Sequence, residues 1–273
     1  MTFSLNGPLI LVGAGKMGGA ILKGLLAHGL DARSVIVQDP SPAPDVAALL
    51  AENVIDVVPA IDALTQPPAV VLVAVKPQIM QAVLPHLAKL AGPSTLFLSI
   101  AAGQRLDAFE KCLPRAAVVR AMPNTPAAIL EGISVAVANA HVTPEQHALA
   151  DAILAAVGRV EWVDDEALLD PVTAVSGSGP AYVFFLAECL AEAGKAAGLE
   201  GALAERLARY TVAGAGALLA ASDLSAAELR RNVTSPGGTT AAALEILGGP
   251  DGLQKLMTEA VAAATKRGRE LAK

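Results

Sequence analysis

The chain has little of what several protein classes require. Of its 273 residues only 3% are aromatic, 17% are charged and two are cysteine, Cys112 and Cys189. Two cysteines far apart exclude a disulfide framework and any Cys-x-x-Cys zinc or redox motif. The four histidines form no His-x-His or His-x-x-x-His pair, so no metal site is predicted.

Positive charge and long apolar runs are also scarce. Lys and Arg number 20 against 26 Asp and Glu, without a basic stripe, which argues against a nucleic-acid partner. Mean hydropathy is high, +0.52, but the longest uninterrupted apolar run, residues 69–75, is far shorter than the roughly 20 residues that span a bilayer. No basic region precedes the first apolar segment, so neither a signal peptide nor an anchor is expected. We therefore expect a cytoplasmic protein that does not bind membranes.

Hydrophobic patterning divides the chain into two parts. Up to about residue 160, short β-branched runs alternate with alanine-rich segments, as in parallel strands joined by helices. The expected strands are residues 9–12, 35–38, 54–57, 70–75, 96–99, 116–120, 134–138 and 159–162, with helices at 16–28, 43–51, 78–90, 104–112 and 144–157. Beyond residue 163 the pattern is helical, with interruptions at 176–180, 198–201, 234–238 and 248–251. This predicts an α/β protein: a Rossmann-type, doubly wound, mostly parallel sheet over residues 1–163, and an all-helical domain over residues 164–273.

The helix expected after Pro180 is apolar on nearly every face. An ordinary surface helix carries a polar stripe, so this one needs cover on all sides. Either it lies at the centre of the helical domain or a second subunit covers it. Small residues such as Gly214 and Gly216 would help helices of two subunits approach closely.

The clearest motif is Gly13-Ala14-Gly15-Lys16-Met17-Gly18, placed directly after the first expected strand and at the start of a helix. The first glycine permits a tight turn, the second lets the backbone approach a pyrophosphate, and the third allows the helix to pack closely on the strand. The helix N-terminus offers N–H groups to the anion. The motif predicts dinucleotide binding, and the alternative is a plain glycine turn.

An acidic residue, Asp39, lies 21 residues after Gly18, where the second strand ends. A carboxylate here accepts hydrogen bonds from the ribose hydroxyls of NAD and repels the 2′-phosphate of NADP, which favours NADH. The alternative is a solvated aspartate in a turn before proline, with Ser41 or Arg33 available to a phosphate.

Three further strand ends carry distinctive residues. Lys76 follows the fourth strand, where it either contacts a phosphate or ribose or is a surface charge. The next strand ends in the small residues 99–103, which would let a flat ring lie against the backbone. The segment 120–126 holds two prolines around Asn124-Thr125 and predicts a rigid turn of undecided purpose.

Two loops of the helical part, residues 176–180 and 234–240, lead into helices. Their N–H groups and hydroxyls would either cradle a carboxylate or simply cap the helices. Neither loop holds a group that titrates near neutrality, and no Ser-His-Asp or Cys-His arrangement is recognisable. If the protein is an enzyme, a cofactor must carry the difficult chemical step.

Six motifs in order, GAGKMG, VAVKP, SIAAG, RAMPNTP, AVSGSGPAY and VTSPGGTT, resemble those of pyrroline-5-carboxylate reductases and cover residues 8 to about 271. The resemblance implies a cytoplasmic oxidoreductase of proline biosynthesis that transfers a hydride from NADPH or NADH to C5 of 1-pyrroline-5-carboxylate, giving L-proline. It also implies a homodimer interlocked through the helical domain, a decamer as a further assembly, and an active site between the two domains.

The resemblance further implies roles for individual residues. Those expected to bind the cofactor are Gly13, Ala14, Gly15, Lys16, Met17 and Gly18 at the pyrophosphate, Asp39, Pro40 and Ser41 at the ribose, Val75, Lys76, Pro77, Ala101 and Ala102 at the nicotinamide half, and Asn232 from the helical domain. Those expected to bind the substrate are Ser235, Gly237, Gly238, Thr239 and Thr240, with Thr240 as the catalytic residue, hydrogen-bonded to the imine nitrogen. Many family members have serine in place of Asp39 and use NADPH well, which leaves the choice between NADH and NADPH open. Many also have glutamate in place of Asp223, so the resemblance assigns Asp223 no role.

Two other functions are compatible with parts of this pattern. A β-hydroxyacid dehydrogenase shares the Rossmann domain followed by helices, but it carries a catalytic lysine shortly into its central helix. Here no lysine follows Gly179 until Lys195. A dinucleotide-binding protein without catalytic activity is the second alternative, and consumption of NADH on addition of pyrroline-5-carboxylate separates it from an enzyme.

Overall fold

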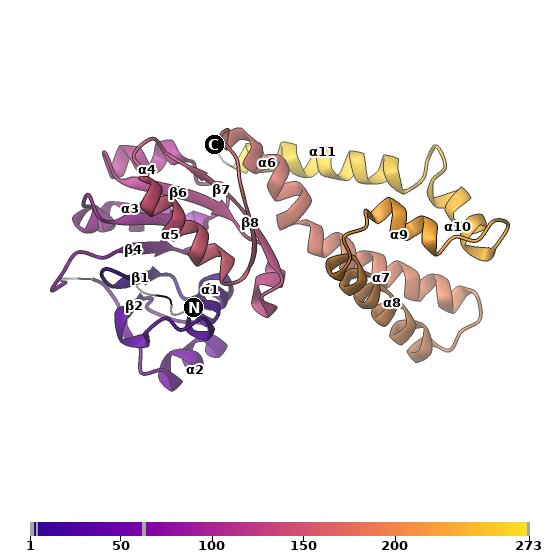
Figure 1. Cartoon of the computed structure of the whole chain (residues 1–273), viewed down its shortest axis with the longest axis horizontal. Coiled ribbons are helices and arrows are strands. Elements are labelled where there is room, and N and C mark those ends of the chain that lie inside the picture. The colour runs from indigo at the N-terminus through magenta and orange to yellow at the C-terminus, as the bar shows by residue number, and fades with distance from the viewer. Residues whose placement is uncertain (1–2, 4, 62–63, 272–273) are drawn as a thin grey trace. The chain divides into compact units, whose positions relative to one another are not determined.

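The computed structural model describes residues 3, 5–61 and 64–271, which form two compact units (Figure 1). One unit contains the residues up to Gly177 together with those from Thr265 onward, and the other is Ser178–Ala264. The first is built on an eight-stranded sheet and the second is helical. The predicted fold class is confirmed. The domain boundary at residue 163 stays a prediction, and the compact units separate later, at Gly177.

The sheet has the strand order β3-β2-β1-β4-β5-β6-β7-β8. Neighbouring strands are parallel except β6 and β7, which are antiparallel. The order reverses between β1 and β4, so the carboxyl ends of these strands frame the crevice where open α/β sheets bind ligands. The strand bounds are β1 (Leu9–Val12), β2 (Val35–Gln38), β3 (Asp56–Val58), β4 (Val70–Val73), β5 (Leu96–Ser99), β6 (Ala117–Met122), β7 (Gly132–Ala138) and β8 (Gly158–Trp162).

Helices cover both faces of this sheet. One face packs against α1 (Lys16–Ala27), α2 (Pro44–Glu52) and α5 (Pro144–Ala155), and the other against α3 (Pro77–Leu87) and α4 (Leu106–Cys112). Successive strand residues alternate between the two cores, as Leu11 and Val12 do. Because neither face of β1 and β4 meets water, their eight residues are all apolar and buried.

Several predicted boundaries are wrong by two or more residues. The third strand begins at Asp56, because Val54 adopts a left-handed conformation (φ +54°) and belongs to the preceding turn. The fourth strand ends at Val73, so the following residues form a loop. The segment 176–180 does not interrupt the helix. Instead, α6 (Leu169–Val172) continues through a π-helical turn, Thr173–Gly177, into α7 (Gly179–Ala196).

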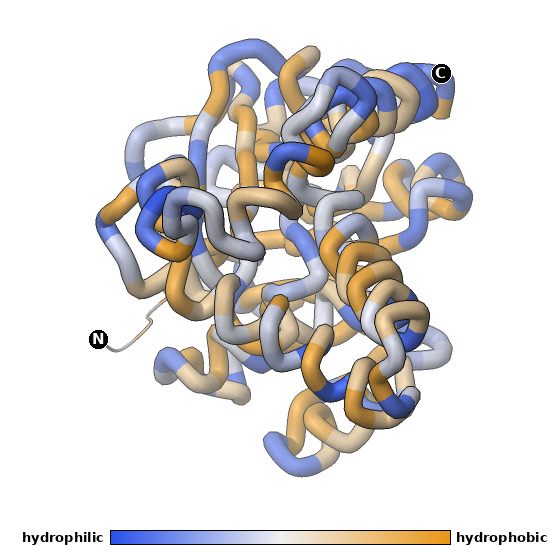
Figure 2. Tube along the Cα trace, turned by 90° about the vertical axis from the view of Figure 1, so that its right-hand side faces the viewer, coloured by the Kyte–Doolittle hydropathy of each residue, from blue (hydrophilic) through white to orange (hydrophobic). Residues whose placement is uncertain are grey.

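The helical unit has almost no core of its own. It contains α7, α8 (Gly201–Ala221), α9 (Ala226–Asn232), α10 (Thr239–Leu247) and most of α11 (Leu253–Leu271). Among its residues only Ala191, Ala204 and Ala208 are buried hydrophobics. Figure 2, in which the right-hand side of Figure 1 faces the viewer, shows hydrophobic residues recurring along the helices in front. Large side chains left exposed include Val183, Phe184, Phe185, Leu186, Leu190, Leu207, Tyr210 and Leu218.

Helical continuity through the π turn changes one expectation. The stretch Glu166–Ala196 is long and apolar enough, by length and composition alone, to cross a membrane. No long uninterrupted apolar run marks this stretch in the sequence, because polar residues, glycines and prolines interrupt it. Length and composition are weak grounds for a membrane span, since a helix buried between subunits has the same pattern.

A buried ion pair ties the start of this long helix to the sheet. Glu166 Oε1 accepts hydrogen bonds from Arg120 Nη1 (2.9 Å) on β6 and from the backbone N–H of Leu106 (2.7 Å) at the start of α4. The Arg120 side chain is 6% exposed and that of Glu166 is 15% exposed. Arg105 lies 3.7 Å from the second carboxylate oxygen. Three elements of the first unit therefore meet at one carboxylate.

Replacing Glu166 by glutamine should lower the free energy of unfolding by about 3 kcal/mol, because it leaves the buried Arg120 guanidinium without a counter-charge. Urea unfolding followed by the fluorescence of Trp162, the single tryptophan, measures this in the first unit. Lys111→Gln is the matched control, since it breaks the exposed pair with Asp107 and should cost no more than about 0.5 kcal/mol. Equal losses of unfolding free energy in the two variants would contradict a stabilising role for the pair of Arg120 and Glu166.

Candidate functional site

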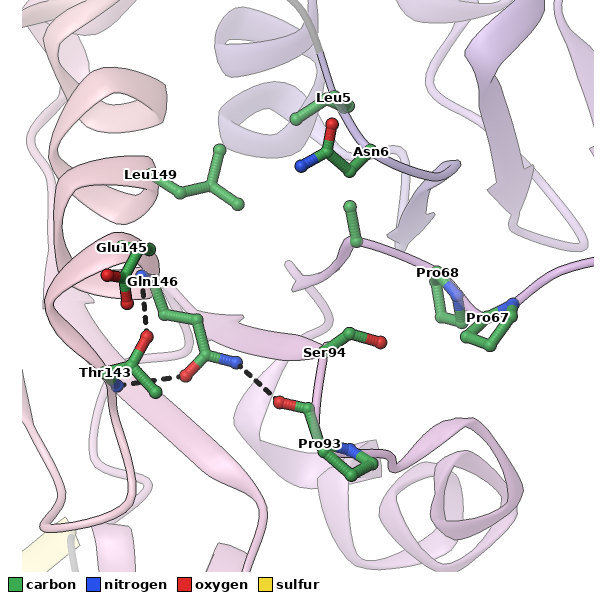
Figure 3. Close-up of a pocket in the computed structure, with 11 residues that line it drawn as sticks. Leu5, Asn6, Pro67, Pro68, Pro93, Ser94, Thr143, Glu145, Gln146 and Leu149 are labelled. Atoms are coloured by element: carbon green, nitrogen blue, oxygen red, sulfur yellow. Dashed lines mark hydrogen bonds between the residues drawn. The ribbon is translucent and has the colours of Figure 1, made fainter.

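One hollow of the first unit lies at the wrong edge of the sheet to hold a cofactor. It has a volume of about 340 Å³ and is lined by residues that precede β1, β4 and β5, among them Asn6, Pro68 and Ser94 (Figure 3). Two of its polar side chains are engaged: Thr143 and Gln146 form the predicted capping box of α5, and Gln146 Nε2 donates to the Pro93 carbonyl (3.3 Å). Open α/β sheets bind ligands at the opposite, carboxyl edge.

At the carboxyl edge, the loop after β1 is so close to β4 that its first residue must be glycine. Gly13 has φ +94°, and a Cβ there would lie 2.9 Å from the backbone of Ala74 and Val75. A Cβ on Gly18 would lie 2.6 Å from the Gly13 carbonyl oxygen. A Cβ on Gly15, in contrast, would meet nothing within 4 Å. Two glycines are thus required by the fold, whereas the middle one keeps a space open.

That open space adjoins the N-terminus of α1. The first helical hydrogen bond runs from Gly19 N–H to the Gly15 carbonyl (2.8 Å), and no side chain caps the helix. The N–H groups of the first turn therefore have no intrahelical acceptor. Together with the helix dipole they suit a pyrophosphate. The motif Gly13–Gly18 thus fits the dinucleotide that the sequence predicts, except that the Ala14 N–H is already engaged.

Asp39 engages that N–H group. Its Oδ2 accepts from the backbone N–H of Ala14 (2.6 Å) and its Oδ1 from that of Ser41 (2.7 Å). The carboxylate therefore joins the loop after β2 to the glycine loop after β1, a role that the sequence did not predict. Each oxygen retains a lone pair, so a ribose hydroxyl can still donate to it. Pro40 and Ser41 are exposed beside it.

The loops after β4 and β5 meet at the same edge. Lys76 is exposed at the N-cap of α3, Pro77 begins that helix, and Val75 is half-buried against the core. Ala101 is buried and Ala102 is exposed. A cavity of about 330 Å³ lies beside them, lined by Pro77, Gln78, Ala102, Gly103, Gln104, Arg120, Asp170, Thr173, Gly268 and Leu271. No motif in the sequence indicated that Thr173 and the end of α11 would line this cavity.

The segment before α10 forms a second anion-binding arrangement, in the helical unit. Gly238 N–H donates to the Ser235 carbonyl (3.0 Å), closing a turn in which Gly237 takes φ +67°. No side chain caps α10. The N–H groups of its first turn, including those of Thr239 and Thr240, are therefore free for a carboxylate. Thr240 is half-buried, and Ser235, Gly237 and Thr239 are exposed.

The predicted cofactor contact Asn232 is the last residue of α9 and is exposed. The predicted capping box starts this helix: Ser225 accepts from the Glu228 N–H, and Glu228 accepts from the Ser225 hydroxyl and N–H. These two hydrogen bonds hold the pKa of Glu228 below its usual value. The segment from Asn232 to Thr240 thus runs from the end of the capped helix α9 into the first turn of α10.

The turn at Asn124 has a structural explanation. Its Oδ1 accepts from the Ile133 N–H (3.0 Å) and so ties the 3-10 turn Thr125–Ile129 to the start of β7.

Among the residues that the structure describes, no group of three or more His, Cys, Asp or Glu side chains could hold a metal ion.

Comparison with known proteins identifies relatives along nearly the whole chain. The family model for pyrroline-5-carboxylate reductase dimerisation matches residues 166–271, and that for NADP oxidoreductase, coenzyme F420-dependent, matches residues 9–103. A pyrroline-5-carboxylate reductase of Pseudomonas aeruginosa is 43% identical over 97% of this chain and 96% of its own length.

Many solved structures share the fold, as two examples show. A pyrroline-5-carboxylate reductase from Coxiella burnetii has a TM-score of 0.87 at 34% identity and covers 98% of this chain and 99% of its own. A pyrroline carboxylate reductase from Plasmodium falciparum with NADP bound has a TM-score of 0.82 at 27% identity. It covers 99% of this chain and 100% of its own.

The different surroundings of the glycines give a test of the dinucleotide loop. Gly15→Ala should cost at most about 1 kcal/mol of stability, because the backbone there is extended and only an N-cap preference is lost. It should nevertheless weaken NAD(P)H binding at least about tenfold, since the new methyl occupies the open space. Gly13→Ala should instead destabilise the fold by about 2–5 kcal/mol, through a strained backbone and a clash with Ala74 and Val75, directly after β4. Calorimetric titration and thermal unfolding measure both effects, and tight binding by Gly15→Ala would place the pyrophosphate elsewhere.

Proposed function

The chain belongs to the pyrroline-5-carboxylate reductase family, and on that premise we propose that it reduces 1-pyrroline-5-carboxylate to L-proline with NAD(P)H, the last step of proline biosynthesis. The observation that carries the proposal is the 43% identity to a curated reductase over 97% of the chain. Because the chain belongs to this family, the β-hydroxyacid dehydrogenase alternative no longer applies.

The first unit would hold the cofactor, which when bound supplies the hydride. The free N–H groups at the start of α1 would bind its pyrophosphate, beside the space that Gly15 keeps open. Asp39, Pro40 and Ser41 would lie at the adenosine ribose. Val75, Lys76, Pro77, Ala101 and Ala102 would lie at the nicotinamide half, and Asn232 would contact the cofactor from the helical unit.

The second unit would hold the substrate. Backbone N–H groups at the start of α10, with the hydroxyls of Ser235 and Thr239, suit its carboxylate. Gly237 and Gly238 would let the ring approach the backbone, and the Thr240 hydroxyl would bind the imine nitrogen. None of these residues is a general acid near neutrality. A pyrroline imine is basic enough to arrive protonated, so the site has only to orient it for hydride attack.

The helical unit would form a homodimer. Its apolar side chains are exposed, and a Cβ on Gly214 or Gly216 would meet nothing within 4 Å. A second copy covering these helices accounts for both observations. We also propose that the dimers assemble into a decamer, as the resemblance implies, and that the enzyme acts in the cytoplasm. Both cysteines, Cys112 and Cys189, are free thiols, as is usual in a reducing compartment.

One assay tests the proposed reaction. Purified protein mixed with NADPH or NADH and 1-pyrroline-5-carboxylate should consume the reduced cofactor and form L-proline in equal amounts, with no consumption when the substrate is omitted. A protein that binds the dinucleotide without turning it over would be a binding protein and not a reductase.

Replacing Asp39 by serine should raise kcat/KM for NADPH relative to NADH by about tenfold or more, because a carboxylate repels the 2′-phosphate and a hydroxyl donates to it. Initial rates with both cofactors, in wild type and variant, measure the ratio. Asp39→Asn is the control, since it removes the charge and keeps an acceptor for the Ala14 N–H. A strong NADPH preference in the wild type would overturn the interpretation of Asp39.

Replacing Thr240 by alanine should lower kcat at least about tenfold while leaving the Kd of NAD(P)H nearly unchanged, because the hydroxyl is expected to orient the imine and not the cofactor. Steady-state rates and calorimetric titration separate the two quantities. Thr240→Ser, which keeps the hydroxyl, should recover most of the rate. Unaltered turnover in the alanine variant would remove Thr240 from the mechanism.

A further inference from the structure

The carboxylate of Asp39 is held by two backbone N–H groups that come from different loops. Its Oδ2 accepts from the Ala14 N–H (2.6 Å) of the glycine loop, and its Oδ1 accepts from the Ser41 N–H (2.7 Å) of the loop after β2. The two N–H groups therefore converge on one carboxylate and form a concave site for a small anion. We call this pair of N–H groups the Asp39 cradle.

The two loops are also joined by bonds that do not involve the Asp39 side chain. The Gly13 N–H donates to the Gln38 carbonyl (3.0 Å), and the Ala43 N–H donates to the Ala14 carbonyl (3.2 Å). Three prolines within residues 40–44 stiffen the second loop, because each fixes its own φ. We therefore expect the cradle to persist when the carboxylate is removed.

Other donors for a phosphate are scarce beside Asp39. Residues 38–44 contain no lysine or arginine, and the three prolines have no N–H group. The N–H groups of Ser41 and Ala43 are both engaged. Arg33 lies before β2, beside residues that precede β1, and pairs with Asp31 (2.8 Å). It is thus at the amino edge of the sheet and is not the phosphate ligand that the sequence left open.

We propose that the Asp39 cradle is a latent site for the 2′-phosphate of NADPH, which this chain fills with its own carboxylate. The inference rests on the proposed function, which places Asp39 at the adenosine ribose. A carboxylate and a phosphate each present two oxygens to a pair of N–H donors, so one can take the place of the other. Asp39 therefore disfavours NADPH twice: its charge repels the phosphate, and its oxygens occupy the donors that the phosphate needs.

Calorimetric titration of 2′-phospho-ADP-ribose into wild type, Asp39→Asn and Asp39→Ala separates the two effects. Both variants lose the charge, but the asparagine oxygen still accepts from the cradle, whereas alanine leaves both N–H groups free. The ligand should bind Asp39→Ala about 3- to 10-fold more tightly than Asp39→Asn, as expected for one more hydrogen bond to a charged group, and wild type most weakly. Because the asparagine amide can itself donate to the phosphate, tighter binding by the alanine variant can come only from the freed N–H groups.

ADP-ribose, which lacks the 2′-phosphate, is the matched ligand control. It should bind Asp39→Ala more weakly than wild type, because the acceptor for the ribose hydroxyls is lost. Measurable binding also shows that the glycine loop of the variant is intact.

The backbone amide signals of Ala14 and Ser41 in isotope-labelled protein identify the donors directly. Adenosine 2′-monophosphate should move both proton signals downfield in Asp39→Ala, because a charged acceptor replaces water. The same ligand should move them much less in wild type, where the carboxylate already accepts from both groups. Adenosine, without a phosphate, should leave them nearly unchanged in both proteins.

The outcomes separate this inference from the proposed function. Equal affinity of Asp39→Asn and Asp39→Ala for 2′-phospho-ADP-ribose would show that charge alone sets the preference, and unchanged amide signals in Asp39→Ala would place the phosphate elsewhere. A gain in Asp39→Ala that disappears when Ser41→Ala is added would assign the phosphate to the Ser41 hydroxyl. An Asp39→Ala protein that no longer binds ADP-ribose would show that the carboxylate shapes the loop. Each of these results overturns the cradle and leaves the reductase intact, whereas wild-type protein that binds neither NADH nor NADPH would overturn both.

Discussion

The first unit depends on one close approach of backbone to backbone, where the loop after β1 meets the end of β4. Gly13 and Gly18 leave no room for a Cβ, and this lets α1 start directly at the edge of the sheet. The first-turn N–H groups of α1 then lie at the point where the strand order reverses, beside the loops after β2 and β4. The constraint serves packing, and it also places the free N–H groups where the proposed dinucleotide would bind, beside the space that Gly15 leaves open.

Most of the sheet and its helices could be predicted from the sequence, because a strand buried on both faces and a helix with a capping box each leave a local pattern. The errors arose where local pattern and tertiary packing differ. Val54 is β-branched but lies in a turn, and the glycines and proline of residues 176–180 are typical of a loop although the chain there continues as a π turn. A run of turn-forming residues does not distinguish a helix end from a helix distortion.

The motifs of the candidate site could be predicted from the sequence, but the hydrogen bonds that join its loops could not. The glycine loop and the segment before α10 are recognisable because each requires glycine at fixed spacing before a helix. The bond from Asp39 to the Ala14 N–H joins residues 25 apart, and the bond from Asn124 to the Ile133 N–H depends on how β7 begins. No spacing rule encodes these contacts.

The helices of the helical unit pack on one another through small residues. Within the chain, α7 and α8 meet through small residues, and a Cβ on Gly194 would lie 3.3 Å from the Cβ of Ala204. Small side chains bring helices close but bury little apolar area, so this pair cannot build a core alone. The larger side chains point elsewhere and are exposed. If a second copy covers them, assembly supplies the missing burial, and the stability of this unit becomes inseparable from protein concentration.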